Sequence, residues 1–265
     1  MLKEVKKLVE KGDMLPLMEE FYTIQGEGYH KGTAAYFVRI GGCDVGCHWC
    51  DVKESWNAKL HPPTETKKIV ESAFSYSNTV VVTGGEPLTW NMGPLTSQFK
   101  KKGMQVHIET SGAYELTGEW DWICLSPKKF KAPCKEAYSK ANELKVVIAH
   151  PSDIEWAKTH AEKVSPTCKL YVQPEWSKQE WFLSNVIDFV KENEKINPHK
   201  LIKVYFNYYG FMKPFFCDKD QSVKYARLIN NFEGNYKSFK NSQAKVWEFF
   251  YALFCFRKKL GRAKN

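Results

Sequence analysis

The sequence has no long uninterrupted apolar stretch and no N-terminal pattern of basic, apolar and small residues. A membrane-spanning helix needs about 20 consecutive apolar residues, and a secretory signal needs the second pattern. Cysteine is also scarce for a disulfide-stabilised protein, with 8 in 265 residues. We therefore expect a soluble cytoplasmic protein without membrane contact, long enough to bury a substantial core.

The positive charge of the chain is unevenly distributed. The net charge is +9, but residues 197–265 carry 14 lysines and arginines against 4 acidic residues, while residues 1–196 carry 25 against 26. A basic tail could contact nucleic acid, yet runs of charge are usually only solvated, and no aromatic residues are spaced as a stacking platform. We expect nucleic acid not to be a partner.

Three of the cysteines, Cys43, Cys47 and Cys50, lie in one glycine-containing stretch with the spacing C-x3-C-x2-C. Three thiolates are one short of a closed zinc site, whereas a cubane iron–sulfur cluster held by three cysteines keeps one iron open for chemistry. Zinc with His48 or a remote cysteine as fourth ligand, in a protein that binds nucleic acid, remains the non-enzymatic alternative. The other cysteines lack such spacing and are expected to be buried or incidental thiols.

Alternating strands and helices follow the cysteines. The pattern predicts strands at 79–82, 105–108, 122–125, 143–149 and 169–172, and helices near 64–76, 92–102, 153–163 and 178–194, after a helix at 1–13 and strands at 17–24 and 34–40. Strands that end in polar or glycine turns and continue into helices indicate parallel β/α units. We predict an α/β fold, with one curved, barrel-like parallel sheet and helices outside it.

Several polar residues stand where such strands end. Gln25 and Glu27, in a loop with two glycines, could bind the edge of a heterocycle. Arg39, in an apolar strand, needs a carboxylate partner, and we favour a carboxylate of the substrate over a structural ion pair with the protein. Glu86, after the glycine pair 84–85, could accept a hydrogen bond from an ammonium group at the carboxyl edge of the sheet.

The cysteine motif followed by residues 83–87 (Thr-Gly-Gly-Glu-Pro) resembles the radical S-adenosylmethionine superfamily. Residues 22–28, 37–39, 47–51 and 126–128 are similar to the 7-carboxy-7-deazaguanine synthase family, in the same order over about 17–195. The resemblance implies a partial (β/α) barrel as a radical S-adenosylmethionine domain at 1–195. A glycyl-radical activase would share the cysteines and residues 83–87, but it would not need the loop at 24–27 or Arg39.

The resemblance also implies a reaction. A 4Fe-4S cluster on Cys43, Cys47 and Cys50 would reductively cleave S-adenosylmethionine, and the resulting 5′-deoxyadenosyl radical would take a hydrogen from 6-carboxy-5,6,7,8-tetrahydropterin. The pterin ring would then contract with loss of ammonia, and the hydrogen would return to the cofactor. A flavodoxin- or ferredoxin-like electron donor, Mg2+ and a homodimer belong to the same expectation.

Site residues follow from the matching positions. The resemblance implies that the pterin is bound by Ile24, Gln25, Gly26, Glu27, Arg39 and Thr83. It implies that S-adenosylmethionine is bound by Trp49, Cys50, Asp51, Gly85, Glu86, Ser126, Pro127, Lys128, Gln173, Pro174, Glu175 and Trp176. Core packing beside the cluster explains Trp49 equally well, and Glu109 and Ser111 are further candidate contacts.

The chain departs from the family at two places. Val52 stands where the family has Thr or Ser as a ligand of Mg2+, and it has no side-chain oxygen to offer a hard cation. Residues 196–265 replace the usual short ending with an atypical basic tail. We hypothesise a frameshift: possible codons for residues 196–203, read two bases later, encode Lys-Ser-Thr-Gln-Thr-His-Lys, close to the family ending. With the tail as given, His199 and Lys200 receive no role.

Overall fold

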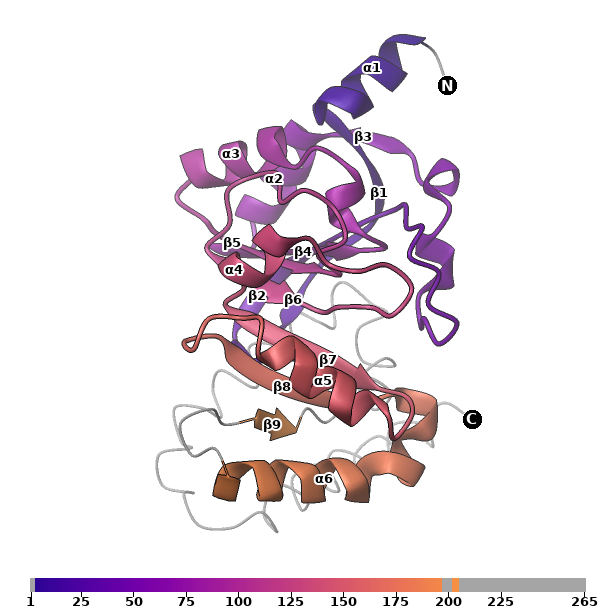
Figure 1. The fold of residues 1–265 in the computed structure, drawn as a ribbon. Coiled ribbons are helices and arrows are strands. Elements are labelled where there is room, and N and C mark those ends of the chain that lie inside the picture. Colours follow the sequence, from indigo (N-terminus) through magenta and orange to yellow (C-terminus); the bar gives the residue numbers. More distant parts are fainter. Residues whose placement is uncertain (1–2, 197–201, 205–265) are drawn as a thin grey trace, which may run out of the picture. The chain divides into compact units, whose positions relative to one another are not determined.

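The computed structural model describes residues 3–196 and 202–204 (Figure 1). The chain divides into two units, residues 1–222 and 223–265. All described residues belong to the first unit. Most of the predicted tail, with His199 and Lys200, lies outside the described residues.

A single sheet organises the described chain. Its nine described strands lie in the order β3-β1-β2-β4-β5-β6-β7-β8-β9. They are β1 (Met14–Ile24), β2 (Ala34–Ile40), β3 (Pro63–Glu65), β4 (Thr79–Gly84), β5 (Gln105–Thr110), β6 (Trp122–Leu125), β7 (Glu143–Ile148), β8 (Lys169–Pro174) and β9 (Ile202–Val204). From β2 through β4 to β9 all neighbours pair in parallel. The predicted parallel sheet is thereby confirmed.

The first strands differ from this pattern, because β1 pairs antiparallel with both β2 and β3. Only the loop 25–33 joins β1 to β2, and a parallel connection needs a crossover of about a dozen residues or more. The hairpin places this loop at one edge of the parallel strands. β3 and β9 were not predicted, since three residues carry too short a pattern to be recognised.

One helix precedes the first strand, and the other helices lie in the connections between later strands. The helices are α1 (Lys3–Lys11), α2 (Thr66–Phe74), α3 (Gly93–Lys101), α4 (Lys135–Lys140), α5 (Asp153–Ala161) and α6 (Gln179–Ile196), with short 3-10 turns η1 (Lys53–Ser55), η2 (Ala58–Leu60), η3 (Pro87–Thr89) and η4 (Trp176–Lys178). Every predicted helix is present within a few residues of its expected bounds. The six-residue α4 was missed because it is barely more than one helical turn.

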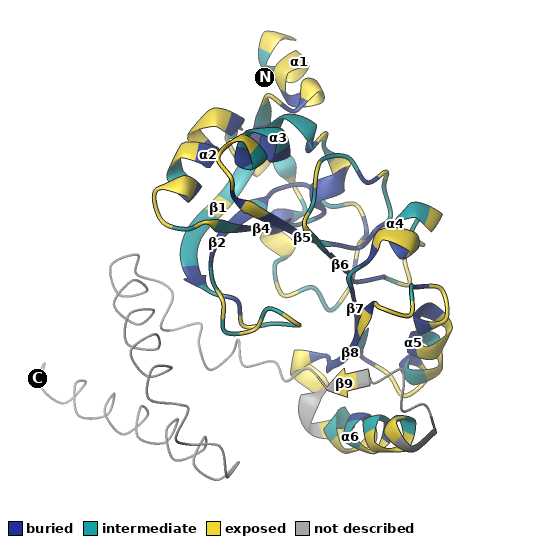
Figure 2. Ribbon diagram, turned by 90° about the vertical axis from the view of Figure 1, so that its left-hand side faces the viewer, coloured by how far each residue is buried: buried dark blue, intermediate teal, exposed yellow. Residues whose placement is uncertain are grey.

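One face of the sheet packs against these helices (Figure 2). Val38, Val82 and Ile108 are fully buried and share one apolar cluster with Leu95 and Phe99 of α3. Strand side chains alternate between faces, so every second residue of a central strand belongs to this helix-covered side, here called the outer face. The other residues of the same strands point to the opposite, inner face.

The inner face carries polar and charged side chains. Arg39 of β2 lies beside Thr83 of β4, and Glu109 of β5 lies beside Cys124 of β6, which in turn lies beside Glu143 of β7. Apolar residues occupy only a small cluster on this side, around Phe21 and Phe37 near the hairpin. A charged row across a largely buried sheet needs a functional explanation, because burying charge costs free energy.

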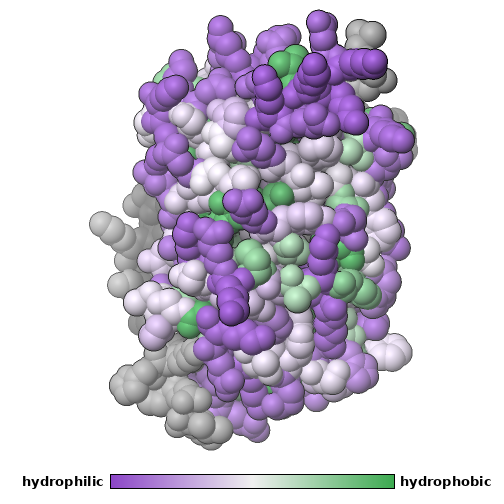
Figure 3. Space-filling model, turned by 45° about the horizontal axis from the view of Figure 1, so that its top comes forward, coloured by the Kyte–Doolittle hydropathy of each residue, from purple (hydrophilic) through white to green (hydrophobic). Residues whose placement is uncertain are grey.

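Polar residues also cover the exterior where it is visible. The face in Figure 3 is mostly hydrophilic, and hydrophobic side chains gather there in small groups. In the part of the chain that the structure describes, no helix combines the length and hydrophobicity that a membrane crossing requires. The outward surfaces of the helices thus agree with the amphipathic patterns from which they were predicted.

Candidate active site

The cysteine loop follows β2 directly and is closed by backbone hydrogen bonds. Gly42 N–H donates to Ser55 O (2.6 Å) and Cys43 N–H donates to Trp56 O (3.1 Å), so the chain returns beside its own starting point. Cys50 N–H donates to Cys47 O (3.0 Å) within the loop. All three cysteines are free thiols, with Cys47 buried and the other two half-buried. The loop therefore presents three thiols from one short, folded segment.

The glycine pair after β4 presses against this loop. Gly85 N–H donates to Ile40 O (3.0 Å) and Glu86 N–H donates to Gly42 O (2.8 Å). A Cβ atom at Gly85 would lie 2.5 Å from Gly42 O and 2.9 Å from the Cβ of Cys43. Only glycine fits at position 85, so the motif 83–87 and the cysteine motif form one continuous backbone surface.

Three thiols on one short loop match the donor set of an iron–sulfur cluster that keeps one iron open. Burial raises the pKa of Cys43 and of Cys47, and the charge of Cys50 adds to both shifts, so the three groups lie within electrostatic reach of one another. A zinc ion needs ligands that converge on one point. Among the described residues, no three Cys, His, Asp or Glu side chains converge in this way. A four-iron cluster is wider, and its thiolate ligands can stand further apart.

Glu86 lies in the site with its carboxylate already hydrogen-bonded. It is 1% exposed and accepts four hydrogen bonds, from Leu88 N (3.1 Å), Thr110 Oγ1 (2.6 Å), Ser111 N (2.7 Å) and Ser111 Oγ (2.5 Å). A carboxylate has about four lone-pair positions. The expected bond to an ammonium group would share or replace one of these donors, so Glu86 also has the structural task of joining β4 to β5.

Residues 126–128 bring a lysine back toward the cysteines. Lys128 Nζ donates to Ser126 O (2.9 Å) and Ser126 Oγ (2.5 Å), and it lies 5.4 Å from the ring centroid of Trp49. Burial lowers the pKa of Lys128, and the nearby Lys145 ammonium adds to this. Ser126 and Pro127 are buried. The predicted residues from two distant segments therefore do meet.

The segment at the end of β8 differs in form from the predicted turn. Gln173 and Pro174 belong to β8, and the turn begins only at Glu175. The Glu175 carboxylate accepts from Ser177 N (3.0 Å) and Ser177 Oγ (2.6 Å) and so stabilises the turn η4, whereas Trp176 is 49% exposed. Of these four residues, Gln173 and Pro174 lie buried at the strand end and Trp176 lies on the surface.

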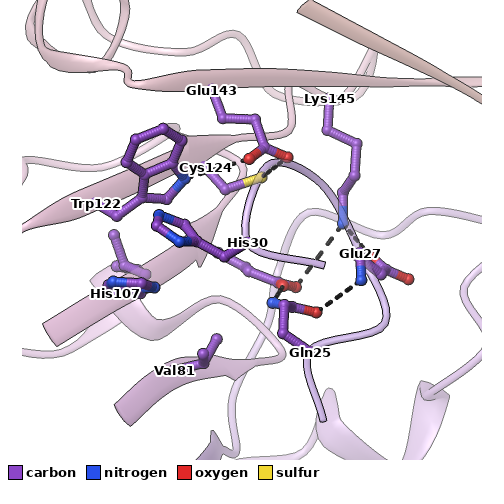
Figure 4. A pocket seen from close by; sticks show the side chains of 11 residues that line it. Gln25, Glu27, His30, Val81, His107, Trp122, Cys124, Glu143 and Lys145 are labelled. Carbon is purple, nitrogen blue, oxygen red and sulfur yellow. Dashed lines mark hydrogen bonds and ion pairs between the residues drawn. The ribbon is translucent and has the colours of Figure 1, made fainter. Parts of the chain in front are cut away.

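Charged side chains from three separate segments meet on the inner face (Figure 4). Lys145 Nζ forms an ion pair with Glu27 and lies 3.8 Å from Glu109 Oε2. Gln25 Nε2 donates to Glu109 Oε1 (3.2 Å), and Thr83 Oγ1 donates to Glu109 Oε2 (3.4 Å). We call Gln25, Glu27, Glu109 and Lys145 the inner network. It lines a narrow cavity that also contacts His30, His107 and Trp122.

The inner network has strongly perturbed electrostatics. Burial raises the pKa of Glu27, against the opposing effect of Lys145. Although burial works in the other direction, Lys145 and the hydrogen bond from Gln25 lower the pKa of Glu109. Likewise, Glu109 and Glu27 outweigh burial and raise the pKa of Lys145 well above its ordinary value. One ammonium thus holds two carboxylates, a grouping typical of functional sites.

Arg39 has the structural partner that the sequence left open. Its Nε donates to Glu19 Oε1 (2.6 Å) across the β1–β2 pair, and Nη1 lies 3.5 Å from Gly84 O. Of the other predicted pterin residues, Ile24 is half-buried at the end of β1 and Gly26 is exposed with open space around it. The structure therefore shows an ion pair at Arg39 where a substrate carboxylate was favoured.

Charges connect the inner network with the cysteine side of the site. The negative charge of Asp51, next to Cys50, contributes to the raised pKa of Glu27, behind burial and Glu109. Val52 offers no side-chain oxygen, and its carbonyl already accepts from Ser55 N (3.0 Å) and Ser55 Oγ (2.6 Å). Asp51 of the cysteine loop thus lies within electrostatic reach of the inner network, and Val52 offers no side-chain ligand for a cation.

Two buried charged residues of the inner face, Glu143 and Lys145, were not predicted. Their signal was present in the sequence, since Glu143-Leu144-Lys145 places two charges on one face of a strand and a leucine on the other. Such alternation is usually interpreted as a solvent-facing side. Here both charged residues are buried, at 3% and 7% exposure, because the inner face is covered.

The chain was compared with known proteins. The family model "Radical SAM superfamily" matches residues 37–122. A 7-carboxy-7-deazaguanine synthase of Flavobacterium psychrophilum is 61% identical over 206 residues, which are 76% of this chain and 98% of the relative. A crystal structure of QueE from Escherichia coli matches with a TM-score of 0.62 and 26% identity, over 77% of this chain and 99% of that one.

A different relative matches a shorter piece. Over 65 residues, 24% of this chain is 60% identical to DNA-directed RNA polymerase subunit beta'' of Phaeodactylum tricornutum, of which it covers 5%. A match to so small a part of a relative carries no functional argument. The long match to a synthase, by contrast, spans almost that whole relative, and the fold agrees with the solved structure. The chain therefore belongs to the 7-carboxy-7-deazaguanine synthase family of radical S-adenosylmethionine enzymes.

Proposed function

We propose that this chain converts 6-carboxy-5,6,7,8-tetrahydropterin into 7-carboxy-7-deazaguanine and ammonia, in the biosynthesis of queuosine or another 7-deazapurine. The observation that carries the proposal is the inner network, which lies beside the cysteine loop. Its carboxylate and amide groups can bind the N–H and C=O groups of a pterin edge. The alternatives of a glycyl-radical activase and a zinc protein find no comparable support.

Cys43, Cys47 and Cys50 would hold the 4Fe-4S cluster of this enzyme family. Once bound, the cluster and S-adenosylmethionine supply the radical that starts the reaction. The chain contributes the backbone surface between Gly42 and Gly85, which leaves no room for a further side chain. It also buries the site, and a buried site keeps water away from a reactive radical.

The predicted S-adenosylmethionine residues keep that role in the proposal. Gly85 and Glu86 are supported by their direct contact with the cysteine loop, and Ser126, Pro127 and Lys128 by the position of Lys128 near Trp49. The polar ends of strands are where parallel sheets bind ligands. The remaining candidates, at the cysteine loop and the end of β8, are Cys50, Asp51, Gln173, Pro174, Glu175 and Trp176.

We propose that the pterin is bound by the inner network together with Ile24, Gly26, Arg39 and Thr83. Gln25 and Glu27 are supported by their contacts with Glu109 and Lys145, and Thr83 by its bond to Glu109. Arg39 could bind a carboxylate only by sharing or leaving Glu19. Ile24 and Gly26 would contribute backbone groups, since neither has a polar side chain.

Mg2+ dependence is proposed to be weaker here than in relatives with Thr or Ser at position 52. Val52 offers no side-chain ligand, and its carbonyl is already engaged by Ser55. A bound cation would rely on oxygens of substrate and water. Titrating Mg2+ into metal-depleted, cluster-loaded enzyme tests this: more than about a tenfold activation of turnover, which corresponds to roughly 1.4 kcal/mol of transition-state free energy, would contradict it.

Two partners belong to the proposal. Each activation needs an electron from outside, for which a flavodoxin- or ferredoxin-like donor is suited, and a homodimer is proposed from the resemblance. Light scattering during size-exclusion chromatography measures the oligomeric state directly. A monomer at micromolar concentration would remove the dimer from the proposal without affecting the chemistry.

We propose that the radical S-adenosylmethionine domain spans 1–195 and that residues 196–265 are an atypical basic tail, which a frameshift would explain. The structure adds β9 to the sheet within the tail. Sequencing the gene across codons 190–210 tests the frameshift, because a frameshift requires that another reading frame encodes the family ending.

The decisive test of the function is anaerobic. The chain is reconstituted with iron and sulfide, and reductant, S-adenosylmethionine, Mg2+ and carboxytetrahydropterin are added. Mass spectrometry then follows 7-carboxy-7-deazaguanine and 5′-deoxyadenosine. Formation of 7-carboxy-7-deazaguanine supports the synthase, with or without 5′-deoxyadenosine because the hydrogen returns to the cofactor in each turnover, whereas 5′-deoxyadenosine alone would show a working radical site with a different substrate.

A further inference from the structure

The loop 25–33 between β1 and β2 carries Gln25 and Glu27 into the inner network, and it is held at both ends. At its base, Gln25 N–H donates to Thr33 O (2.8 Å) and Gly32 N–H donates to Gln25 O (2.8 Å). These bonds close the base of the loop but do not fix its orientation relative to the sheet. Its direction over the sheet is set by what its tip touches.

The tip is bound by Glu143, at the beginning of β7. Glu143 is 3% exposed. Its Oε2 accepts from the backbone N–H of Tyr29 (3.0 Å). The same oxygen accepts from Trp122 Nε1 (3.2 Å), and Oε1 lies 3.7 Å from Cys124 Sγ (Figure 4). Burying a carboxylate costs free energy unless hydrogen-bond donors compensate it. In turn, the N–H groups of Tyr29 and Trp122 need an acceptor, because an unpaired buried donor is also costly.

Only glycine fits at position 28, because the loop backbone lies so close to the Glu143 carboxylate. Gly28 has φ +69°, and a Cβ atom there would lie 2.0 Å from Glu143 Oε1. The backbone of the loop thus rests directly on the carboxylate. A left-handed φ and the missing space both require glycine, which fixes where the loop can pass.

Aromatic rings complete the attachment. Tyr29 stacks on Trp122 with ring centroids 4.9 Å apart, and His30 meets the edge of Trp122 at 4.4 Å. Because the indole N–H of Trp122 also donates to Glu143, one carboxylate orients both the ring and the backbone that pack together. We call Tyr29, Trp122 and Glu143 the loop clamp.

The clamp and the inner network use the same two segments. Glu27 pairs with Lys145, and two residues later in the loop Tyr29 binds Glu143, two residues earlier in β7. Two contacts between the same segments fix both position and direction, whereas one would allow rotation. From this geometry we propose that Glu143 is a positioning residue that holds Gln25 and Glu27 toward the pterin, a role that rests on the proposed function.

The test compares Glu143→Leu with Glu143→Gln. Leucine removes the acceptor, while the glutamine amide oxygen keeps the bonds to Tyr29 and Trp122 and turns its NH2 toward Cys124. We expect Glu143→Leu to raise the KM for the pterin at least about tenfold, as for loss of hydrogen bonds to a carboxylate. It should also increase the ratio of 5′-deoxyadenosine to deazaguanine. The KM for S-adenosylmethionine and the iron content should stay within about twofold.

Two further variants keep the test decisive. Gly28→Ala, which pushes the loop off Glu143, should reproduce the raised pterin KM even where Glu143→Leu does not fold. Glu115→Leu, on an exposed loop, is the matched control and should change neither KM. Glu143→Gln should stay near wild type, and a loss equal to that of Glu143→Leu would overturn the positioning role.

The possible failures are distinct. A wild-type chain that makes no deazaguanine would overturn the proposed function and this inference with it. Wild-type turnover with an unchanged pterin KM in both Glu143→Leu and Gly28→Ala would overturn only the inference. A parallel rise in both KM values, with loss of iron, would show that Glu143 merely supports the fold.

Discussion

The two faces of the sheet contrast in chemistry although the same strands build both. On the outer face, Val38, Val82 and Ile108 pack against helices without a polar atom. On the inner face, the neighbouring positions Arg39, Thr83 and Glu109 carry charge and hydrogen-bonding groups. Both faces are largely buried, so exposure does not separate them.

The contrast shows how one fold divides its tasks. Outer-face residues stabilise by removing apolar surface from water, and this effect does not depend on direction. Inner-face residues lose free energy on burial and recover it only through correctly placed partners. Substitutions on the outer face should therefore change stability, and those on the inner face should change chemistry and pH dependence.

The largest expected effect is on the outer face. Phe99→Ala removes a fully buried ring of α3 and should lower the free energy of unfolding by about 4 kcal/mol. Turnover per cluster of the folded protein should remain near wild type. Urea unfolding measures the first quantity and the anaerobic assay the second. The control Phe74→Ala, at a 43% exposed ring, should cost less than about 1 kcal/mol. A large loss of turnover per cluster in folded Phe99→Ala would contradict the division of tasks between the two faces.

Next in size is a charge of the inner face. Lys145→Met leaves Glu27 and Glu109 without their shared ammonium and should destabilise the protein by about 3 kcal/mol at pH 7. The loss should shrink at pH 5, because carboxylates without a cation become protonated there. Pterin turnover should fall strongly as well. Lys100→Met is the matched control: its ion pair with Asp121 is partly exposed and is worth less than about 1 kcal/mol. An equal loss of stability in Lys145→Met and Lys100→Met would contradict the contrast between buried charges of the inner face and exposed charges.

A histidine of the inner face should give a smaller, pH-dependent effect. Burial, followed by His30, lowers the pKa of His107 to about 4, against the opposing charges of Asp121 and Glu109. Since the folded pKa lies below the unfolded value of about 6.5, stability is present above pH 6.5 and is lost as the pH falls toward 4. Between pH 7 and pH 5 we expect a loss of about 2 kcal/mol in wild type that His107→Gln does not show. Identical pH dependence in both proteins would refute the assignment.

The smallest expected effect is on the reduction potential of the cluster that the cysteine loop would hold. Trp56 Nε1 donates to Cys50 Sγ (3.4 Å), and hydrogen bonds to cluster sulfurs favour the reduced state. Trp56→Phe should therefore lower the reduction potential of the loaded cluster by about 40 mV, equivalent to about 1 kcal/mol for one electron. Trp90→Phe is matched to it, because that indole donates to Gly41 O (2.9 Å) instead. A redox titration followed by electron paramagnetic resonance should find the potential of Trp90→Phe unchanged.

Local patterns explain which parts could be predicted. The three cysteines and the glycine pair lie within short stretches, and the β/α alternation repeats along the chain, so the partial barrel and the cluster loop were recognisable. β1 and β2 showed strand patterns without revealing their antiparallel pairing. The predicted site residues remain a prediction as a set, although the structure brings Gln25, Glu27 and Thr83 together.

Partners far apart in sequence explain what could not be predicted. The structural ion pair of Arg39 with Glu19 depends on the register of the hairpin, and the four donors of Glu86 depend on β5 lying beside β4. Lys145 stands 118 positions from Glu27, so no local spacing connects them. Their contact follows only from the order of strands in the sheet.

The close packing of Gly85 on the cysteine loop has a consequence for biosynthesis. The loop leaves the ribosome about forty residues before the glycine pair against which it rests, and β4 must first align with β2 to bring the two together. A nascent chain that ends before residue 86 therefore has its three cysteines but lacks one wall of their site. The site that would hold the cluster is therefore complete only after the β4 turn has been synthesised and β4 has paired with β2.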